Sequence, residues 1–252
     1  MNNIYSQLKN HLDELKLAQV TNHLDEYIDL VNKDKKTMTE ALYELFAYEV
    51  EAKKIRTMHS CVKVAGFPAI KTFDDFDFSF QPSINKQQMK QFKYLDFVEK
   101  KENILFIGTP GVGKTHLAIA IGVEAAKMRK ITYFISCHDL LTKLKQAHLE
   151  NRLEKQMKVY CKYKVLIIDE IGYLPYDIES ANLLFRLISL RYEKSSTIIT
   201  TNKPLSKWHE VFGDVVIANA ILDRLLHHSH IINITGKSYR MKDYLDDIDD
   251  ED

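Results

Sequence analysis

Residues 108–115, GTPGVGKT, have the types and spacing of a loop that binds the phosphates of a nucleotide. Glycines allow backbone conformations in which successive N–H groups turn toward phosphate oxygens. Lys114 supplies a positive charge for the β and γ phosphates, and Thr115 supplies a hydroxyl for Mg²⁺. The candidate nucleotide-binding residues are Gly108, Thr109, Pro110, Gly111, Val112, Gly113, Lys114, Thr115 and His116.

The segments on either side of this loop fit the same chemistry. An apolar run at 103–107 predicts a buried strand, and the pattern from His116 onward predicts a helix. The amino end of such a helix favours anions. A glycine-rich turn that matches by chance is the alternative, and the strand and helix around the motif argue against it. We therefore predict that the chain binds a nucleoside triphosphate, taken to be ATP, together with Mg²⁺.

A second chemical motif, VLIIDE, follows about fifty residues later and ends in two acids. Its apolar residues predict a buried strand with Asp169 at the carboxyl end, where ligands bind in open α/β sheets. We expect Asp169, with Thr115, to hold Mg²⁺. Glu170 can orient and deprotonate a water that attacks the γ phosphate, so the pair points to hydrolysis.

Three further polar residues are candidates for contacts to the γ phosphate. Asn202 ends the predicted strand STIITTN and could bind the γ phosphate or the attacking water, although TTN before Pro204 also fits a plain turn. Arg224 and Arg240 could neutralise charge on the transferred phosphoryl group. For Arg224 an ion pair with Asp223 or another nearby acid is the alternative.

Strand and helix patterns alternate from residue 103 onward. Near-continuous apolar strands separated by helices predict an α/β fold with a parallel sheet covered on both faces. The predicted strands are 103–107, 131–136, 164–170, 196–202 and 230–234, and predicted helices include 138–163 and 180–192.

Composition is that of a globular chain, with 252 residues, 45% hydrophobic and 28% charged. No apolar run approaches the length of a membrane span, and the polar amino terminus does not resemble a signal peptide, so we expect a cytoplasmic protein without a membrane partner. Cys61, Cys137 and Cys161 are too far apart in sequence to indicate a zinc site or a disulfide framework.

The net charge of zero hides an uneven distribution. Residues 242–252 form an acidic tail, so residues 1–241 carry 34 basic and 28 acidic residues. Residues 127–164 hold ten Lys or Arg against three acids, a candidate footprint for a polyanion or else a solvated helix face. The candidate DNA contacts in this segment are Lys143, Lys145, Arg152, Lys155 and Lys158.

Residues 1–66 read as a small all-helical N-terminal domain, with a capping-box pattern at 37–40. Its charge is nearly balanced, so a partner-docking module fits as well as a DNA-binding one. The sequence GFP at 66–68 predicts a boundary, and we expect the nucleotide-binding domain at 67–241. The phenylalanines at 73–80 could wall an adenine pocket or simply pack in the core.

The ordered set GTPGVGKT, VLIIDE, TTN and LDRLLHH resembles an AAA+ ATPase of the initiator and helicase-loader group. The stretches FDFSFQPS, IDEIGYLP, WHEVFGD and INITGKSYR are more closely similar to the IstB family, ATP-binding helper proteins of insertion sequences and relatives of the DnaC loaders. The resemblance covers nearly the whole chain. It implies an AAA+ P-loop NTPase with a five-stranded parallel sheet, which forms a homo-oligomeric ring or spiral on double-stranded DNA and directs a transposase to target sites.

The resemblance also implies roles for individual residues. It makes Glu170 the water-activating residue, Asn202 the sensor of the γ phosphate and Arg224 the finger offered to a neighbouring subunit. Arg240 matches a second sensor arginine less well, because a full lid domain cannot fit after it. Arg186 and Arg191 remain further candidates for contacts between subunits.

Three functions fit these patterns. The first is an ATP-dependent, DNA-binding regulator of transposition whose ATP hydrolysis is stimulated by its partner. A loader of a replicative helicase shares every catalytic residue and would differ in its partner. A small-molecule kinase uses the same loop, but Glu170 beside Asp169, and Asn202, favour hydrolysis over transfer.

Overall fold

The computed structural model describes residues 4–242, and the chain divides into two compact units between Ser60 and Cys61. The predicted boundary lies slightly later, at Gly66, which has a positive φ of 73° just after the last helix of the first segment ends at Val64. The predicted acidic tail lies, except for Lys242, outside the described residues. None of the helices in residues 4–242 is both long and apolar enough to cross a membrane.

The first unit is helical, as the periodic apolar residues predict. It contains α1 (Ile4–Glu14), α2 (Ala18–Asn32) and most of α3 (Met38–Val64). Thr37 and Glu40 form the predicted capping box: the backbone N–H of Thr37 donates to Glu40 Oε2 (2.8 Å) and that of Glu40 to Thr37 Oγ1 (3.3 Å). Apolar residues from all three helices make a small core of their own: Leu12, Val20, Leu24, Tyr27, Ala41 and Leu45.

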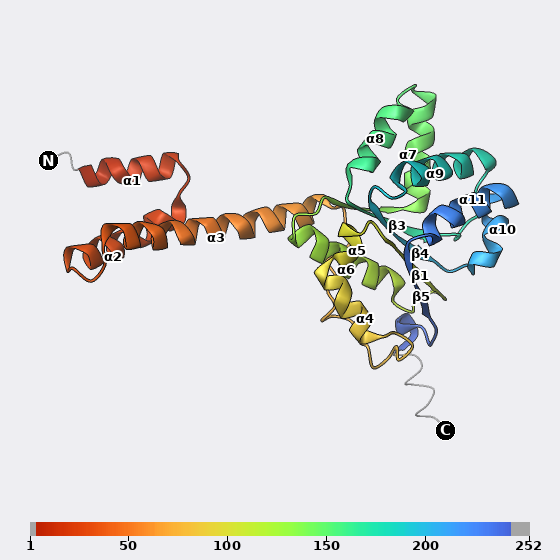
Figure 1. Ribbon diagram of the computed structural model, residues 1–252, viewed down its shortest axis with the longest axis horizontal. Coiled ribbons are helices and arrows are strands. Elements are labelled where there is room, and N and C mark those ends of the chain that lie inside the picture. Colours follow the sequence, from red (N-terminus) through yellow and green to blue (C-terminus); the bar gives the residue numbers. More distant parts are fainter. Residues whose placement is uncertain (1–3, 243–252) are drawn as a thin grey trace. The chain divides into compact units, whose positions relative to one another are not determined.

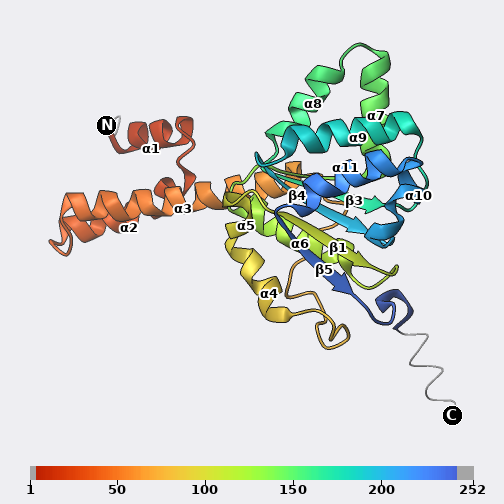
Figure 2. The same cartoon turned by 45° about the vertical axis from the view of Figure 1, so that its right-hand side comes forward.

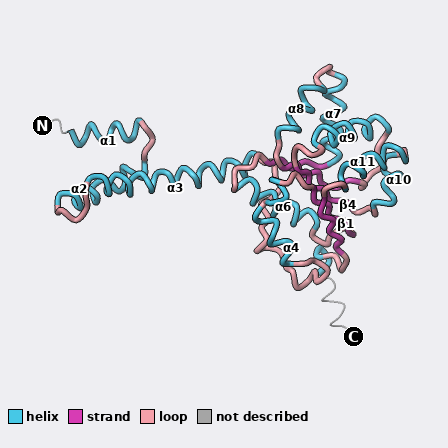
Figure 3. The backbone as a smooth tube through the Cα atoms, in the orientation of Figure 1, coloured by secondary structure: helices cyan, strands magenta, loops and turns pink. Residues whose placement is uncertain are grey.

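The second unit is built on a five-stranded parallel sheet with the strand order β2-β3-β4-β1-β5. Figure 3 shows its strands as one layer within the helices of this unit. The strands are β1 (Asn103–Gly108), β2 (Thr132–Ser136), β3 (Val165–Ile171), β4 (Ser196–Thr201) and β5 (Ser229–Ile234). Each strand predicted from the sequence is present, and no strand end differs from its predicted position by more than one residue.

Helices cover both faces of this sheet because alternate strand side chains point to opposite sides. In β3, Val165 and Ile167 pack toward one layer, and Leu166 and Ile168 toward the other. Figures 1 and 2 show α4, α5 and α6 on one side of the strands and α7 to α11 on the other. The first layer contains α4 (Lys86–Gln91), η1 (Phe92–Tyr94), α5 (Asp96–Glu99) and α6 (Lys114–Lys127). The second contains α7 (Cys137–Leu149), α8 (Leu153–Lys162), α9 (Ile178–Arg191), α10 (Trp208–Phe212) and α11 (Val215–Leu226).

The predicted single helix at 138–163 is wrong in one respect, because it is two helices. Asn151 has a φ of 55°, in the left-handed region that ends helices, and the backbone N–H of Arg152 returns to the carbonyl of Ala147. The candidate lysines therefore lie on two elements, α7 and α8, and Arg152 lies between them. Short 3₁₀ turns complete the unit at η2 (Leu205–Lys207) and η3 (Tyr239–Met241).

Candidate nucleotide site

The phosphate-binding loop joins β1 to α6 and needs glycine because other chain segments press against it. Gly111 has a φ of 83°, and a Cβ there would lie 1.9 Å from Ser238 Oγ. Gly113 has a φ of 98°, and a Cβ there would lie 2.5 Å from the ring of Phe76. Only glycine combines these angles with these contacts. The loop is thus enclosed by an aromatic residue on one side and the segment after β5 on the other.

A cavity of about 400 Å³ opens over the loop, which is within the usual range for a small-molecule site. Most of the predicted site residues line it: Pro110, Gly111, Val112, Gly113, Lys114, Thr115, His116, Glu170, Asn202 and Arg240. Gly108 and Thr109 form the end of β1 and the start of the loop, and Asp169 lies directly beneath Thr115. The carboxyl ends of β1, β3 and β4 therefore meet at one site, as their parallel arrangement requires.

Asp169 is buried, with 6% of its surface exposed, and hydroxyl groups satisfy its carboxylate. Thr115 Oγ1 donates to its Oδ1 at 2.9 Å, and Thr200 Oγ1 donates to the same oxygen at 2.5 Å. Burial raises the pKa of Asp169, while these two hydroxyls and the charge of Lys114 oppose the rise. A desolvated carboxylate beside a hydroxyl offers the hard oxygen ligands that Mg²⁺ prefers, so these residues fit the ion.

Glu170 stands where the strand is distorted. Its φ is 61°, which is uncommon for a residue with a Cβ, and the pairing of β3 with β4 shifts between Ile168 and Ile171. The backbone N–H of Glu170 donates to Thr200 Oγ1 at 2.9 Å, which helps to hold this conformation. The bulge leaves the Glu170 side chain exposed at the cavity while Asp169 stays buried. Two adjacent acids thus have different environments.

Thr200 is a site residue that we did not predict, since TTN pointed to Asn202 alone. One hydroxyl of Thr200 contacts both Asp169 and the backbone of Glu170. A threonine at a buried strand end beside an acidic pair is a signal that could have indicated it. Asn202 also lines the cavity, and its Oδ1 is buried without a hydrogen-bond partner within the described part of the chain. Such an atom is costly to leave unpaired, which suits a ligand-binding position.

Lys114 is largely buried, with 9% exposure, and its Nζ donates to the backbone oxygen of Thr109 at 2.8 Å. Burial lowers the pKa of Lys114, and the charge of Asp169 opposes that effect. The lysine therefore rests on its own loop, at the wall of the cavity. Arg240 adds a second cation to the cavity wall, and the neighbouring Tyr239 N–H anchors its turn to the carbonyl of Gly111 (3.0 Å).

The phenylalanines of residues 73–80 have different surroundings. Phe76 lines the cavity and meets the ring of His116 edge to face at 5.1 Å. His116 Nε2 lies 2.8 Å from the carbonyl oxygen of Thr72, which holds the imidazole in place. Phe73, by contrast, is buried in the core. The cavity thus has an aromatic wall next to the loop, suited to a planar base.

The arginines considered for subunit contacts lie outside this cavity. Arg224, on α11, donates to the carbonyl of Ala220 (3.0 Å), and its guanidinium lies 4.7 Å from the centre of the Phe185 ring. Arg186 pairs with Glu154 at the surface. Arg191 as a subunit contact is wrong: it is buried, with its guanidinium bonded to carbonyls of its own chain.

The basic segment is partly neutralised within the chain. Lys145 pairs with Asp177, and Arg152 pairs with Glu150. Lys143, Lys155 and Lys158 are exposed and have no ion pair within residues 4–242. These three lysines are therefore the members of the predicted DNA-binding set whose charge is available to another molecule.

Comparisons with known proteins agree with this geometry. A family described as "IstB-like ATP binding protein" matches residues 10–246. The ATP-binding protein assigned to insertion sequence IS232 of Bacillus thuringiensis subsp. berliner is 54% identical over 244 residues, covering 97% of this chain and 98% of the relative. The corresponding protein of insertion sequence IS21 of Pseudomonas aeruginosa is 44% identical, covering 92% and 88%.

Solved structures show the fold. The DnaC helicase loader aligns with a TM-score of 0.50 and 24% identity over 59% of this chain and 87% of that one, and DnaI with 0.55 and 22% over 66% and 91%. The replication initiator DnaA, bound to AMPPCP and single-stranded DNA, aligns with 0.54 and 18% over 73% and 56%. The second unit therefore has the AAA+ P-loop NTPase fold. The chain belongs to the family of IstB-like ATP-binding proteins of insertion sequences.

Proposed function

We propose that this chain is an ATP-driven regulator of transposition, which hydrolyses ATP, assembles on double-stranded DNA and directs a transposase to its targets. The observation that carries the proposal is the acidic pair at the end of β3. Asp169 is buried against Thr115 of the phosphate loop, and Glu170 is exposed in the same cavity. Membership in a family of insertion-sequence ATP-binding proteins supports the biological setting.

In the proposed site, different residues bind the phosphates, the base and the metal ion. The loop N–H groups and Lys114 bind the β and γ phosphates, and Phe76 and His116 face the base. Thr115 and Asp169 hold Mg²⁺, which supplies charge neutralisation of the phosphates when bound. The raised pKa of Asp169 means that its charge is poorly solvated, so a cation there would relieve a cost already present in the fold.

Hydrolysis then depends on Glu170 and Asn202. The Glu170 carboxylate accepts a proton from a water whose oxygen attacks the γ phosphorus. The bond from that phosphorus to the bridging β oxygen breaks, and ADP and inorganic phosphate leave. Asn202, whose buried Oδ1 has no partner among the described residues, orients the water or the γ phosphate. Thr200 positions Glu170 through its backbone N–H.

Arg224 completes the site of a neighbouring subunit in this proposal. It does not line the cavity of its own chain, and Phe185 and Ala220 hold it on α11. An arginine contributed by a neighbour makes hydrolysis depend on assembly. ATP would then join subunits together, which fits a homo-oligomer arranged on DNA.

Double-stranded DNA is proposed to contact the lysines of α7 and α8. Lys143, Lys155 and Lys158 carry charges that the described part of the chain does not pair. Lysines that meet phosphates bind DNA without reading its sequence, which suits a factor that acts at many targets. The paired Lys145 and Arg152 have a smaller role, because binding would first have to break their ion pairs.

Electron microscopy and ATPase assays with duplex DNA test the proposal. Glu170→Gln should bind ATP and remain in DNA-dependent assemblies, whereas Lys114→Ala should prevent both. Glu179→Gln, which changes an exposed acid on α9 in the same way, is the matched control and should behave as the unchanged protein. A chain that stays monomeric with ATP and DNA and hydrolyses no ATP would refute the proposal.

A helicase loader is the second candidate, and the fold shared with the DnaC and DnaI structures favours it. Both functions use the same nucleotide site, so the partner decides between them. Capture of purified transposase or replicative helicase by the full chain, with ATP present, separates the two. Binding of the helicase alone would select the loader.

A further inference from the structure

Three potential metal ligands lie together at the amino ends of the strands, whereas the nucleotide site lies at their carboxyl ends. Glu193 is in the turn between α9 and β4, and His227 and His228 are in the turn between α11 and β5. Parallel strands begin at a common edge, and β1 alone separates β4 from β5 in the sheet. The fold therefore brings together two turns that are distant in sequence.

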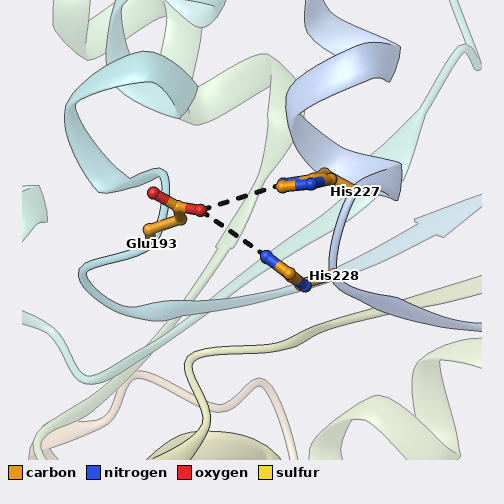
Figure 4. Close-up of side chains that lie close together, drawn as sticks. All are labelled: Glu193, His227 and His228. Atoms are coloured by element: carbon orange, nitrogen blue, oxygen red, sulfur yellow. Dashed lines mark ion pairs between the residues drawn. The ribbon is translucent and has the colours of Figure 1, made fainter.

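The donor atoms already approach the spacing of a metal site. Glu193 Oε1 is 3.8 Å from His227 Nδ1 and 3.5 Å from His228 Nε2, and Figure 4 shows both histidine rings turned toward the carboxylate. The three donor atoms all lie within 4.8 Å of one another. Ligands about 2.1 Å from a tetrahedral Zn²⁺ are about 3.4 Å apart. Small side-chain rotations would suffice to bind an ion.

We propose that Glu193, His227 and His228 bind a divalent transition-metal ion of the zinc type, with water completing the coordination. Two imidazoles and one carboxylate suit Zn²⁺ and its neighbours better than Mg²⁺ or Ca²⁺, which prefer oxygen ligands alone. About half of each side chain is exposed, so an ion can enter and water can reach it. This inference does not depend on the proposed function, because the three ligands lie at the opposite ends of the strands from the nucleotide site.

Ion pairing alone is a weak reason for this arrangement. Exposed pairs contribute little, and the two imidazole rings lie only 4.0 Å apart between centres, where two positive charges would repel. A single metal ion uses both imidazoles as neutral ligands and keeps the carboxylate paired. The cost is that the ion displaces the Tyr192 hydroxyl, which lies 2.6 Å from His227 Nδ1.

A bound ion would join the end of α11 to the turn that begins β4. Arg224 lies on the same helix, one turn before His227. The ion would thus restrict local opening of the helix end that carries this arginine and raise the unfolding temperature of the second unit. It would leave the nucleotide cavity unchanged, because none of the three ligands lines that cavity.

Equilibrium dialysis of the full chain against Zn²⁺, without nucleotide because nucleotides chelate the ion, tests the proposal. We expect one ion per chain with a raised unfolding temperature. Glu193→Gln and His228→Ala should each weaken binding at least about tenfold, because loss of even an outer-shell partner has that effect. His148→Ala and Glu179→Gln, which change exposed residues elsewhere, are the matched controls and should bind as the unchanged protein.

The free thiols are the main competing ligands. Cys137 is buried, so Cys61→Ser and Cys161→Ser cover the accessible ones. Co²⁺ in place of Zn²⁺ reports the ligand type, since thiolates give an intense charge-transfer band and nitrogen and oxygen ligands do not. Zinc binding that survives both His228→Ala and Glu193→Gln, or that disappears in a cysteine variant, would overturn the proposal.

Discussion

Replacing Arg191 with methionine should unfold the second unit at a much lower temperature. Its side chain is 1% exposed and faces no carboxylate among the groups that bond to it. Instead, it donates to oxygens at the end of α8 and the start of β4. The four hydrogen bonds are Nε to Thr197 Oγ1 (3.1 Å), Nη1 to the carbonyls of Tyr160 (2.7 Å) and Tyr163 (2.9 Å), and Nη2 to the carbonyl of Ser196 (2.6 Å).

The expected loss follows from those contacts. Burial lowers the pKa of Arg191 to about 10, so the group is still charged at neutral pH. Methionine has a similar length and keeps much of the packing, but the four acceptors lose their donor. Each buried acceptor left unpaired costs about 1–3 kcal/mol, and the costs of neighbouring acceptors do not add fully, so we expect about 3–5 kcal/mol in total. For a unit of this size that is about 6–20 °C in Tm.

Tryptophan fluorescence offers a direct assay. Trp208 is the single tryptophan of the chain and is fully buried in the second unit, so its emission follows that unit alone. Arg186→Met is the matched control: the same substitution on the same helix, at an exposed arginine, should change Tm by no more than about 2 °C. An Arg191→Met protein with the Tm of the unchanged chain but no DNA-dependent assembly would refute the structural role and restore the subunit contact.

Three other perturbations have defined outcomes. Asp169→Asn should raise the Tm of the nucleotide-free protein and abolish Mg²⁺-dependent ATP binding. Because the folded state raises the pKa of Asp169, the stability of the unchanged protein should fall as pH rises from the ordinary aspartate pKa through the raised one. Thermal scans of the Asp169→Asn variant over the same pH range should lack that fall. Arg224→Ala should keep ATP binding but lose about 10³-fold in hydrolysis, and mixing with a P-loop variant that retains the arginine should restore part of the rate. Changing Lys143, Lys155 and Lys158 to Gln should lower the slope of log binding constant against log salt by about 2.7 per subunit in filter-binding titrations, while an unchanged slope would exclude them.

The sheet was predictable because its strands are nearly continuous apolar runs with clear ends. The first four residues of β3, and all residues of β1 and β4, are uncharged, so these strands stand out in the sequence. The polar residues at the carboxyl ends of β3 and β4 follow from the same reasoning, which predicts Asp169, Glu170 and Asn202, whereas Lys114 follows from the spacing of the glycine-rich loop. Functional residues at strand ends can thus be predicted where the strand itself can be predicted from the sequence.

Contacts between distant segments were not predictable in the same way. Nothing in the local pattern of α9 distinguishes Arg191 from Arg186, although the first is buried and the second exposed. The difference arises because the turns beside α8 and β4 present free carbonyls to one side of the helix. The end of α7 at Asn151 was equally hard to predict. Asn151 adopts the left-handed conformation that glycine usually supplies, and a single asparagine is a weak signal of a helix end in the sequence.

The nucleotide site buries two ionisable residues of opposite charge, Asp169 and Lys114. Burial raises the pKa of Asp169 and lowers that of Lys114, so the fold disfavours the charged form of each residue. In the proposed function a cation and a polyphosphate would give each of these charges a partner in place of the water it lost. In the proposed mechanism the two carboxylates have different partners: exposed Glu170 can reach the attacking water, and buried Asp169 depends on a bound cation to offset the burial of its charge. The bulge in β3 separates these two environments within a single peptide unit, and Thr200, which bonds to both residues, holds that separation in place.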